Sequence, residues 1–300
     1  MNMEHAIEID GLTKYYGDFL ALEKFDLTVN KGEILGFLGP NGAGKTTTIR
    51  CLLGLIGATD GVARIFGLDV QKEKIAAHRH VAYVPGEANL WPNLTGAETL
   101  ELLANIQGGV DEKYREELID RFKFDPNKKV RAYSKGNRQK INLIAAFASR
   151  ADVLILDEPT SGLDPLMEEV FRGCVLEAKR NGQTVFLSSH ILGEVEALCD
   201  RVAVLRSGKL VEFGTLDELR HLSAVTVDAT FEGTPPKVGH IKGVSNVKTN
   251  KGHLTCQVQG SIDALLVELA KAHPISFLSR EPSLEELFLS LYGDAEEKKA

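Results

Sequence analysis

The chain has 300 residues, of which 43% are hydrophobic and 26% charged, and its formal net charge is −7. A chain of this length can bury a large core as one domain or two unequal ones, and its negative charge, without an obvious lysine or arginine stripe, does not favour nucleic acid as the main partner. No apolar run approaches the ~20 residues that a membrane-spanning helix needs, so we expect any membrane role to come through another chain.

Residues 6–33 are expected to form antiparallel strands, because apolar residues such as Ile7 and Ile9 alternate with polar ones on both sides of a loop. The loop carries two adjacent tyrosines, Tyr15 and Tyr16. From the residues alone, core packing is the favoured interpretation of this pair. The alternative is that the flat ring of Tyr16 stacks on an adenine.

A glycine-rich loop follows the apolar run 34–38 and precedes a helical pattern that continues to Leu55. Four of its positions fit G-x-x-x-x-G-K-[ST], the spacing of the phosphate-binding P-loop. Backbone N–H groups in such a loop form a concave anion site at the positive end of the following helix. The lysine adds a charge for the β- and γ-phosphates, and the threonine hydroxyl can ligate Mg²⁺. The residues concerned are Gly39, Pro40, Asn41, Gly42, Ala43, Gly44, Lys45, Thr46 and Thr47.

Short strands are expected at 62–66 and 81–84, after which the periodicity becomes helical. We expect a helical insertion over about residues 88–150. Near its end, Ser134 stands where an N-cap belongs, and Gly136 permits close backbone approach. The apolar helix that follows would offer a second N-terminus suited to an anion, although many helices begin in this way and bind nothing.

The apolar run 153–156 predicts a strand buried on both faces of a parallel sheet, and two carboxylates follow it directly. Asp157 can hold Mg²⁺ through its water shell, and Glu158 can accept a proton from an attacking water. His190 ends the next aliphatic strand, which places it at the same edge of the sheet. A helix between these strands and a hairpin over 202–213 complete the domain.

The sequence pattern changes after about residue 222. Strand and helix patterns alternate through residues 223–293, and the last predicted helix, over 284–291, has apolar residues at i, i+3, i+4 and i+7. We expect a small α+β domain here, followed by a disordered tail over 294–300.

The four cysteines lie far apart, with no C-x-x-C spacing. We therefore expect packed thiols in a reducing cytoplasmic compartment, rather than a metal site or disulfides.

Three of these motifs, taken together, resemble the ATP-binding cassette (ABC) ATPases. Residues 39–47 match the Walker A motif, residues 153–158 match Walker B, and residues 134–138 match the signature motif in the degenerate form common among exporter ATPases. They follow one another in family order and at family-like spacing, and the resemblance covers about residues 5–220.

Smaller features extend the resemblance. Residues 161–164 are similar to the D-loop, His190 to the switch histidine and Tyr16 to the adenine-stacking aromatic. The end of the chain, 282–293, resembles the tail domain of the daunorubicin-resistance type of export ATPase.

The resemblance implies a P-loop NTPase α/β fold with an antiparallel β subdomain and a helical subdomain, plus a small C-terminal α+β domain. Residues 1–222 would form the ATP-binding domain and residues 223–293 an accessory domain. The implied activity is ATP hydrolysis with Mg²⁺. The implied partners are a separately encoded transmembrane permease and a second ABC ATPase, identical or related, at the cytoplasmic face of the membrane.

The resemblance implies roles for the residues of the chain whose own P-loop binds the ATP. Glu158 would orient the attacking water, while His190 and Lys45 would hold the γ-phosphate. Thr46 and Asp157 would hold the metal.

Two cassettes of this kind close head to tail, with each ATP between one P-loop and the signature helix of the other copy. Ser134 and Gly136 would then contact the γ-phosphate across the interface, with the D-loop residue Asp164 beside them. ATP binding would close the pair and loss of the phosphate would reopen it. The helical insertion, through Trp91 and its neighbours, would transmit this motion to the permease.

One position departs from the family pattern. Family members usually carry Gln, or Glu in this exporter branch, directly after the equivalent of Pro85, where this chain has Gly86. Glycine offers no side chain to the metal or the water. Glu87 could substitute by a one-residue shift, as a metal contact, or hydrolysis could be slow.

Two other functions are compatible with these motifs. One is a soluble cassette ATPase that acts on ribosomes or DNA, but such proteins typically carry two cassettes or a long coiled coil, whereas this chain has one cassette. The other is a nucleotide-sensing module that does not hydrolyse ATP, which Gly86 would favour. The transported substrate cannot be read from the sequence, because the permease would determine it.

Overall fold

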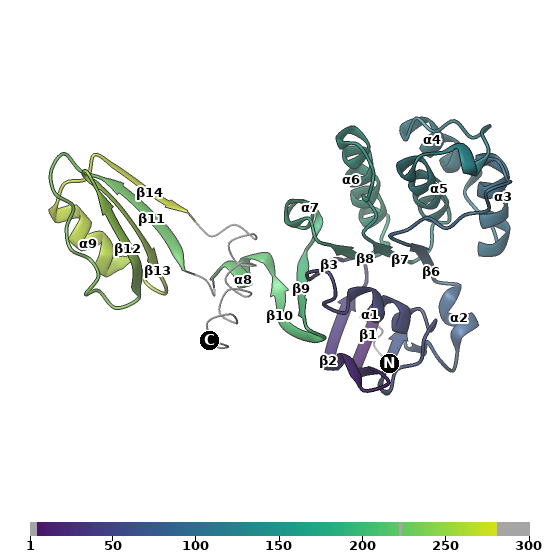
Figure 1. Cartoon of the computed structure of the whole chain (residues 1–300), viewed down its shortest axis with the longest axis horizontal. Helices are drawn as coiled ribbons and strands as arrows, with labels where there is room; N and C mark the ends of the chain where they lie inside the picture. The colour runs from purple at the N-terminus through teal and green to yellow at the C-terminus, as the bar shows by residue number, and fades with distance from the viewer. Residues whose placement is uncertain (1–4, 222–223, 281–300) are drawn as a thin grey trace. The chain divides into compact units, whose positions relative to one another are not determined.

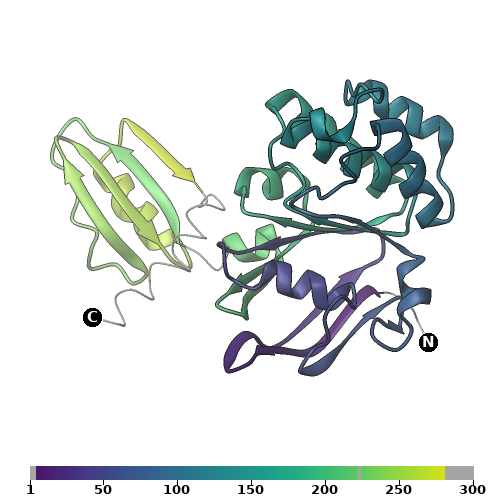
Figure 2. The ribbon, with the colours of Figure 1, turned by 45° about the vertical axis from the view of Figure 1, so that its right-hand side comes forward.

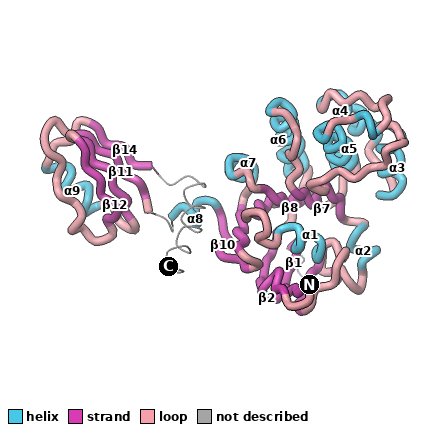
Figure 3. The backbone as a smooth tube through the Cα atoms, in the orientation of Figure 1, coloured by secondary structure: helices cyan, strands magenta, loops and turns pink. Residues whose placement is uncertain are grey.

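A computed structural model describes residues 5–221 and 224–280 of the chain. The chain divides into two compact units, unit 1 (Met1–Phe213) and unit 2 (Gly214–Ala300), and each has its own hydrophobic core. Figure 1 labels the helices and strands of both units, and Figure 3 shows helices in cyan and strands in magenta. Within the described ranges, no helix has the length and apolar character that crossing a membrane requires.

The first sheet of unit 1 is antiparallel where β1 pairs with β2 and β4, and its order is β2-β1-β4-β5. The expectation of a loop around Lys14–Gly17 is wrong. The first strand continues to Tyr16, and only Gly17 and Asp18 form the turn, with Gly17 at φ 57°. The strands are β1 (His5–Tyr16), β2 (Phe19–Asn30), β4 (Asp60–Ile65) and β5 (Leu68–Asp69).

The second sheet of unit 1 has six strands in the order β10-β9-β3-β8-β7-β6. Pairing is parallel from β9 through β6, and β3, β7 and β8 are buried along their whole length, as their aliphatic runs predict. The strand that precedes the P-loop therefore lies beside β8, which in turn lies beside β7. The strands are β3 (Ile34–Leu38), β6 (Val81–Val84), β7 (Val153–Asp157), β8 (Thr184–Ser189), β9 (Arg201–Arg206) and β10 (Lys209–Thr215).

Unit 1 is built in layers around this sheet, as Figure 2 shows. One face packs on α1 (Lys45–Leu52) and the antiparallel sheet in one core. The other face is covered by helices that include α6 (Pro165–Arg180) and α7 (Leu192–Leu198). The helix predicted as far as Leu55 ends three residues earlier. Gly54 has φ 58°, and a Cβ there would lie 2.4 Å from the carbonyl oxygen of Val70.

The region between β6 and β7 is helical, as the periodicity predicts. It contains α3 (Gly96–Gln107), α4 (Glu112–Arg121) and α5 (Lys135–Ala148). Thr95 and Glu98 form a capping box at the start of α3, which satisfies N–H groups that would otherwise lack partners. A short helix, α2 (Lys74–His78), precedes β6, and a 3₁₀ turn (Val130–Ala132) precedes α5.

In unit 2 the sheet order is β12-β13-β11-β14, and every adjacent pair is antiparallel. Its core holds the apolar residues of β11 and β13 together with Leu265 and Leu269 of the helix α9. The sequence did not predict β12, and the helix predicted over 284–291 and the tail over 294–300 lie outside the described residues. The elements are α8 (Leu216–His221), β11 (Val225–Thr230), β12 (Val244–Asn250), β13 (His253–Val258), α9 (Asp263–Lys271) and β14 (Ser276–Arg280).

Candidate active site

The glycine-rich loop joins β3 to α1 and depends on glycine at three positions. Gly42 and Gly44 have φ angles of 82° and 112°, in the region that favours glycine. Gly39 is needed for a different reason, because a Cβ there would lie 2.5 Å from the carbonyl oxygen of Leu205. The backbone can therefore curl at the N-terminus of α1 and direct N–H groups toward an anion.

Lys45 is the first residue of α1 and is only 5% exposed. Its Nζ donates a 2.6 Å hydrogen bond to the carbonyl oxygen of Gly39 and lies 3.6 Å from Oε1 of Glu158. Burial lowers the pKa of this ammonium, and the charges of Glu158 and Asp157 raise it. A buried lysine between two carboxylates and the loop is a cation held ready for a phosphate.

Asp157, at the end of β7, is 5% exposed, and Thr46 Oγ1 donates a 3.2 Å hydrogen bond to its Oδ2. Burial raises the pKa of the Asp157 carboxyl, and the neighbouring hydroxyls of Ser188 and Thr46 lower it. Ser188, opposite Asp157 in the β7–β8 register, has a buried Oγ with no hydrogen-bond partner of good geometry among the described residues. This oxygen set fits Mg²⁺, which binds through a carboxylate, a hydroxyl, phosphate oxygens and water. Within the described ranges, no three His, Cys, Asp or Glu side chains are grouped so that they could hold a metal ion.

Glu158 follows Asp157 in a strained conformation, with φ at 47°. Its Oε1 lies 3.4 Å from Nδ1 of His190, which follows β8. The parallel pairing of β7 and β8 thus brings together two residues that are far apart in the sequence, as predicted from their positions at strand ends. The Lys45 ammonium and the His190 imidazole therefore both lie beside Oε1 of Glu158, a carboxylate oxygen that could orient a water.

A pocket of 300 Å³ lies over the P-loop, with Glu158 in its lining. Tyr16 and Phe19, which face each other across the β1–β2 turn, contribute aromatic rings that are 45% and 67% exposed. The exposure contradicts the core interpretation of the tyrosine pair. Phe19 was not identified from the sequence, although its place directly after a two-residue turn from Tyr16 was a usable signal. The remaining lining residues are Ala21, Pro40, Asn41, Gly42, Gly44, Lys45, Thr46 and Thr47.

A second pocket, of 440 Å³, is lined by Thr46, Asp157 and Glu158 together with Glu87. Gly86 also lines it, and a Cβ there would lie 3.2 Å from the Asp157 carbonyl oxygen. Gln139 of α5, which is buried, donates from Nε2 to the carbonyl oxygens of Pro85 and Pro159. The segment that contains Pro85 and Gly86 is thereby connected through Gln139 of α5 to the segment that follows β7. The metal role of Glu87 stays a prediction.

Ser134, Gly136 and Asp164 do not line the P-loop pocket. Ser134 is the exposed N-cap of α5 and Asp164 is the N-cap of α6, and each accepts a hydrogen bond from the backbone three residues on. Gly136 lies against the D-loop of its own chain, because a Cβ there would be 2.2 Å from the carbonyl oxygen of Gly162. Within one chain, Ser134 and Asp164 therefore cap the helices α5 and α6. The start of α5 also contacts the segment that follows Glu158.

Substitution of Gly136 by alanine is expected to lower both stability and ATP turnover. A Cβ cannot fit beside the Gly162 carbonyl, so the D-loop or α5 must move, at a cost of about 1–3 kcal/mol, which lowers Tm by several degrees. Thermal unfolding and steady-state turnover measure the effect. Gly193→Ala is the matched control, because it is also a helical glycine but has open space around the new Cβ. Unchanged Tm and turnover in Gly136→Ala would contradict the packing argument.

Comparison with known proteins agrees with this geometry. Residues 22–161 match the family model described as ABC transporter. The chain is 37% identical to the bacitracin transport ATP-binding protein BcrA of Enterococcus faecalis, over 73% of this chain and 72% of that protein. It is 35% identical to the daunorubicin resistance ATP-binding protein DrrA3 of Streptomyces coeruleorubidus, over 96% of both chains.

Solved structures show the same fold. An ATP-binding subunit of an ABC transporter superposes with a TM-score of 0.67 and 32% identity, over 72% of this chain and 92% of that one. A dimeric ATP-binding cassette with ADP and Pi bound has a TM-score of 0.63 at 22% identity, over 70% and 98% of the two chains. The α/β P-loop fold expected from the sequence is thus confirmed, and the chain belongs to the ABC transporter family as an ATP-binding subunit with ATPase activity.

Proposed function

We propose that this chain is the ATPase of an exporter, that it pairs head to tail with a second ABC ATPase, and that it drives a separately encoded permease at the cytoplasmic face of the membrane. Residues 1–222 form the ATP-binding domain in this proposal, and residues 223–293 an accessory domain. The relatives named for bacitracin transport and daunorubicin resistance support export.

The observation that carries the pairing is that the two phosphate-binding features of the chain are separated. The P-loop pocket contains Lys45 and Thr46, whereas the N-terminus of α5 at Ser134 is exposed and outside that pocket. No acidic residue lies in the first turn of α5, so its positive end is available to an anion. A second copy placed head to tail would bring this helix end to the open side of the bound triphosphate.

Apolar side chains near the catalytic residues also support pairing. Leu166, at the start of α6, is 70% exposed, and Ile191, next to His190, is 42% exposed. Exposed apolar groups beside polar catalytic residues are typical of surfaces that a partner covers.

In the paired state, each catalytic residue acts on the triphosphate held by Lys45 and the loop N–H groups. Bound Mg²⁺ would neutralise phosphate charge, and Thr46 and Asp157 are the residues that would hold it. Glu158 orients the attacking water and accepts its proton. His190, 3.4 Å from Glu158, holds the γ-phosphate. Tyr16 and Phe19 supply flat rings for the base.

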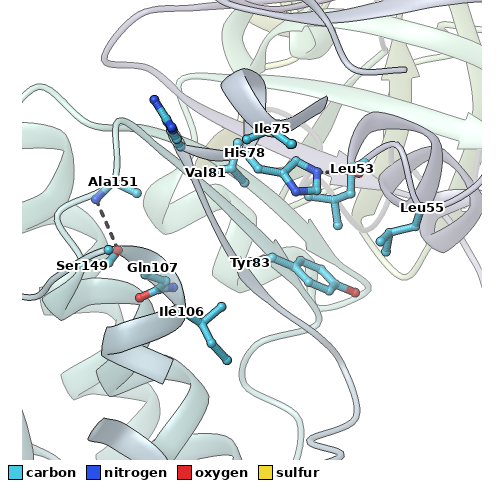
Figure 4. Close-up of a pocket in the computed structure, with 12 residues that line it drawn as sticks. Leu53, Leu55, Ile75, His78, Val81, Tyr83, Ile106, Gln107, Ser149 and Ala151 are labelled. Atoms are coloured by element: carbon cyan, nitrogen blue, oxygen red, sulfur yellow. Dashed lines mark hydrogen bonds between the residues drawn. The ribbon is translucent and has the colours of Figure 1, made fainter. Parts of the chain in front are cut away.

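A groove of 760 Å³ in unit 1 offers a docking surface for a short helix of the permease (Figure 4). Leu55, Ile75 and Ile106 line it and are 55%, 78% and 66% exposed. Ile106 comes from α3 of the helical region, whereas Leu55 and Ile75 follow α1 and begin α2. A helix seated here would contact the helical region and the P-loop side at once. Trp91, 45% exposed, adds a further apolar contact outside this lining.

Ile106→Asp is expected to reduce recovery of the permease at least ~10-fold, because a buried carboxylate in the interface lacks a partner. The variant should fold normally, since exposed positions tolerate substitution. Recovery is measured by affinity purification from detergent-solubilised membranes, and intrinsic ATP binding should be unchanged. Ile275→Asp, at a position 63% exposed in unit 2, is the matched control. Equal recovery of the permease by both variants would contradict this docking surface.

The same purification tests the function as a whole. Recovery of a polytopic membrane protein with the wild-type chain supports the exporter. Recovery of ribosomes or DNA instead would overturn it.

A further inference from the structure

Glu194 of α7 is a buried carboxylate that no step described so far uses. Its side chain is 8% exposed, and its Oε2 accepts a 2.7 Å hydrogen bond from the hydroxyl of Ser189. The hydroxyl of Thr160 also lies near this carboxylate and lowers its pKa. Ser189 and Thr160 are themselves buried, at 2% and 6% exposure.

The two hydroxyls belong to the two segments that carry the catalytic residues. Ser189 directly precedes His190 at the end of β8, and Thr160 lies two residues after Glu158, directly before the D-loop. Both segments line one pocket of 260 Å³. One carboxylate therefore fixes the His190 segment and the Glu158 segment relative to each other.

The hydrogen-bond directions explain why a carboxylate suits this position. An ionised carboxylate only accepts, so both hydroxyls must donate to it. The Ser189 oxygen is then free to accept from the backbone N–H of Ile191, at 3.0 Å, which holds the turn around His190. A glutamine would present an NH₂ group to one of the hydroxyls and reverse that bond.

Keeping this charge buried is costly. The charged groups that face it are Glu168 and Arg172 of α6, and Arg172 pairs with Glu169 at 2.9 Å. The salt bridges of the described residues do not include Glu194. Burial raises the pKa of the Glu194 carboxyl, and the hydroxyls of Ser189 and Thr160 lower it. Because the folded pKa lies above the unfolded value, the ionised group destabilises the fold at neutral pH, and stability recovers as the pH falls through that window.

We propose that Glu194 is a positioning residue for ATP hydrolysis, which holds His190 and Glu158 in register through Ser189 and Thr160. The proposal rests on the function proposed above for those two residues. This role explains why the Glu194 carboxylate, whose burial lowers stability, lies next to the segments that carry His190 and Glu158.

Glu194→Gln in the full-length chain is expected to lower kcat about 10-fold, less than the ~100-fold or more that loss of the general base itself would cost, while KM for ATP changes less than about 2-fold. Tm should stay the same or rise, because a buried charge is removed. The ratio of wild-type to variant kcat should fall toward one as the pH is lowered through the raised pKa of Glu194, because protonation removes the wild-type advantage. Other groups that titrate in the same way in the wild type and in Glu194→Gln affect both kcat values equally, so their effect cancels in the ratio.

Two further variants keep the test decisive. Ser189→Ala should lower kcat in the same way, and its effect should not add to that of Glu194→Gln. Glu116→Gln, at an exposed glutamate of α4, is the control. A kcat for Glu194→Gln within about 2-fold of wild type, or a loss of kcat that tracks a lower Tm and is independent of pH, would overturn the proposal. Full turnover in Glu158→Gln would instead show that the proposed catalytic site is wrong.

Discussion

Glu158→Gln is expected to lower ATP turnover at least ~100-fold, the usual contribution of a general base, while ATP binding is retained. The change keeps the size of the side chain but removes the acceptor for the proton of the attacking water. Oε1 of Glu158 lies 3.4 Å from His190 and 3.6 Å from Lys45, so the carboxylate is at the centre of the proposed reaction geometry. Steady-state phosphate release measures turnover, and calorimetry measures binding.

The same variant tests the pairing. With hydrolysis blocked, ATP should hold two copies together, or this chain with a related cassette, and light scattering would detect the doubled mass. Ser134→Arg in the Glu158→Gln background should prevent this association, because a bulky side chain replaces the exposed cap at the N-terminus of α5. Near-normal turnover in Glu158→Gln would remove the assignment of the general base.

Much of the site could be predicted because its signals are local. The P-loop spacing indicates a turn between a strand and a helix, and the aliphatic runs before Asp157 and before Ser188 are typical of buried parallel strands. Since parallel strands end at one edge, Asp157, Glu158 and His190 were expected together, and the structure places them so. The fold class followed from the same signals.

Other parts depend on contacts that no local pattern encodes. The helix α7 is seven residues long, too short for periodicity to distinguish it from a loop. The strand β12 is exposed at all but one position and contains a bulge where Asn246 has φ 51°, so its apolar alternation is lost. The proposed role of Glu194 appears only in the structure, where the end of β8 and the segment after Glu158 meet at its side chain.

The second large effect is expected at Lys45, because among the described residues that line the P-loop pocket it is the only one with a positive charge. The ammonium is buried and close to Glu158. Without it, the acidic groups Asp157 and Glu158 would face the triphosphate uncompensated. Like charges at this range, in a partly buried site, repel strongly.

Lys45→Ala is therefore expected to abolish ATP binding, with a loss of affinity of at least ~100-fold, which corresponds to about 2.7 kcal/mol. Titration calorimetry with Mg²⁺ and ATP measures this loss, and thermal unfolding confirms that the variant is folded. Lys113→Ala, at an exposed lysine of α4, should bind ATP as the wild type does.

Lys45→Arg keeps the charge but should retain binding only in part. The planar guanidinium does not replace the compact ammonium, which donates a 2.6 Å hydrogen bond to the carbonyl oxygen of Gly39. Retained affinity in Lys45→Ala would mean that the triphosphate lies away from this loop, and the assignments of Glu158 and His190 would fall with it.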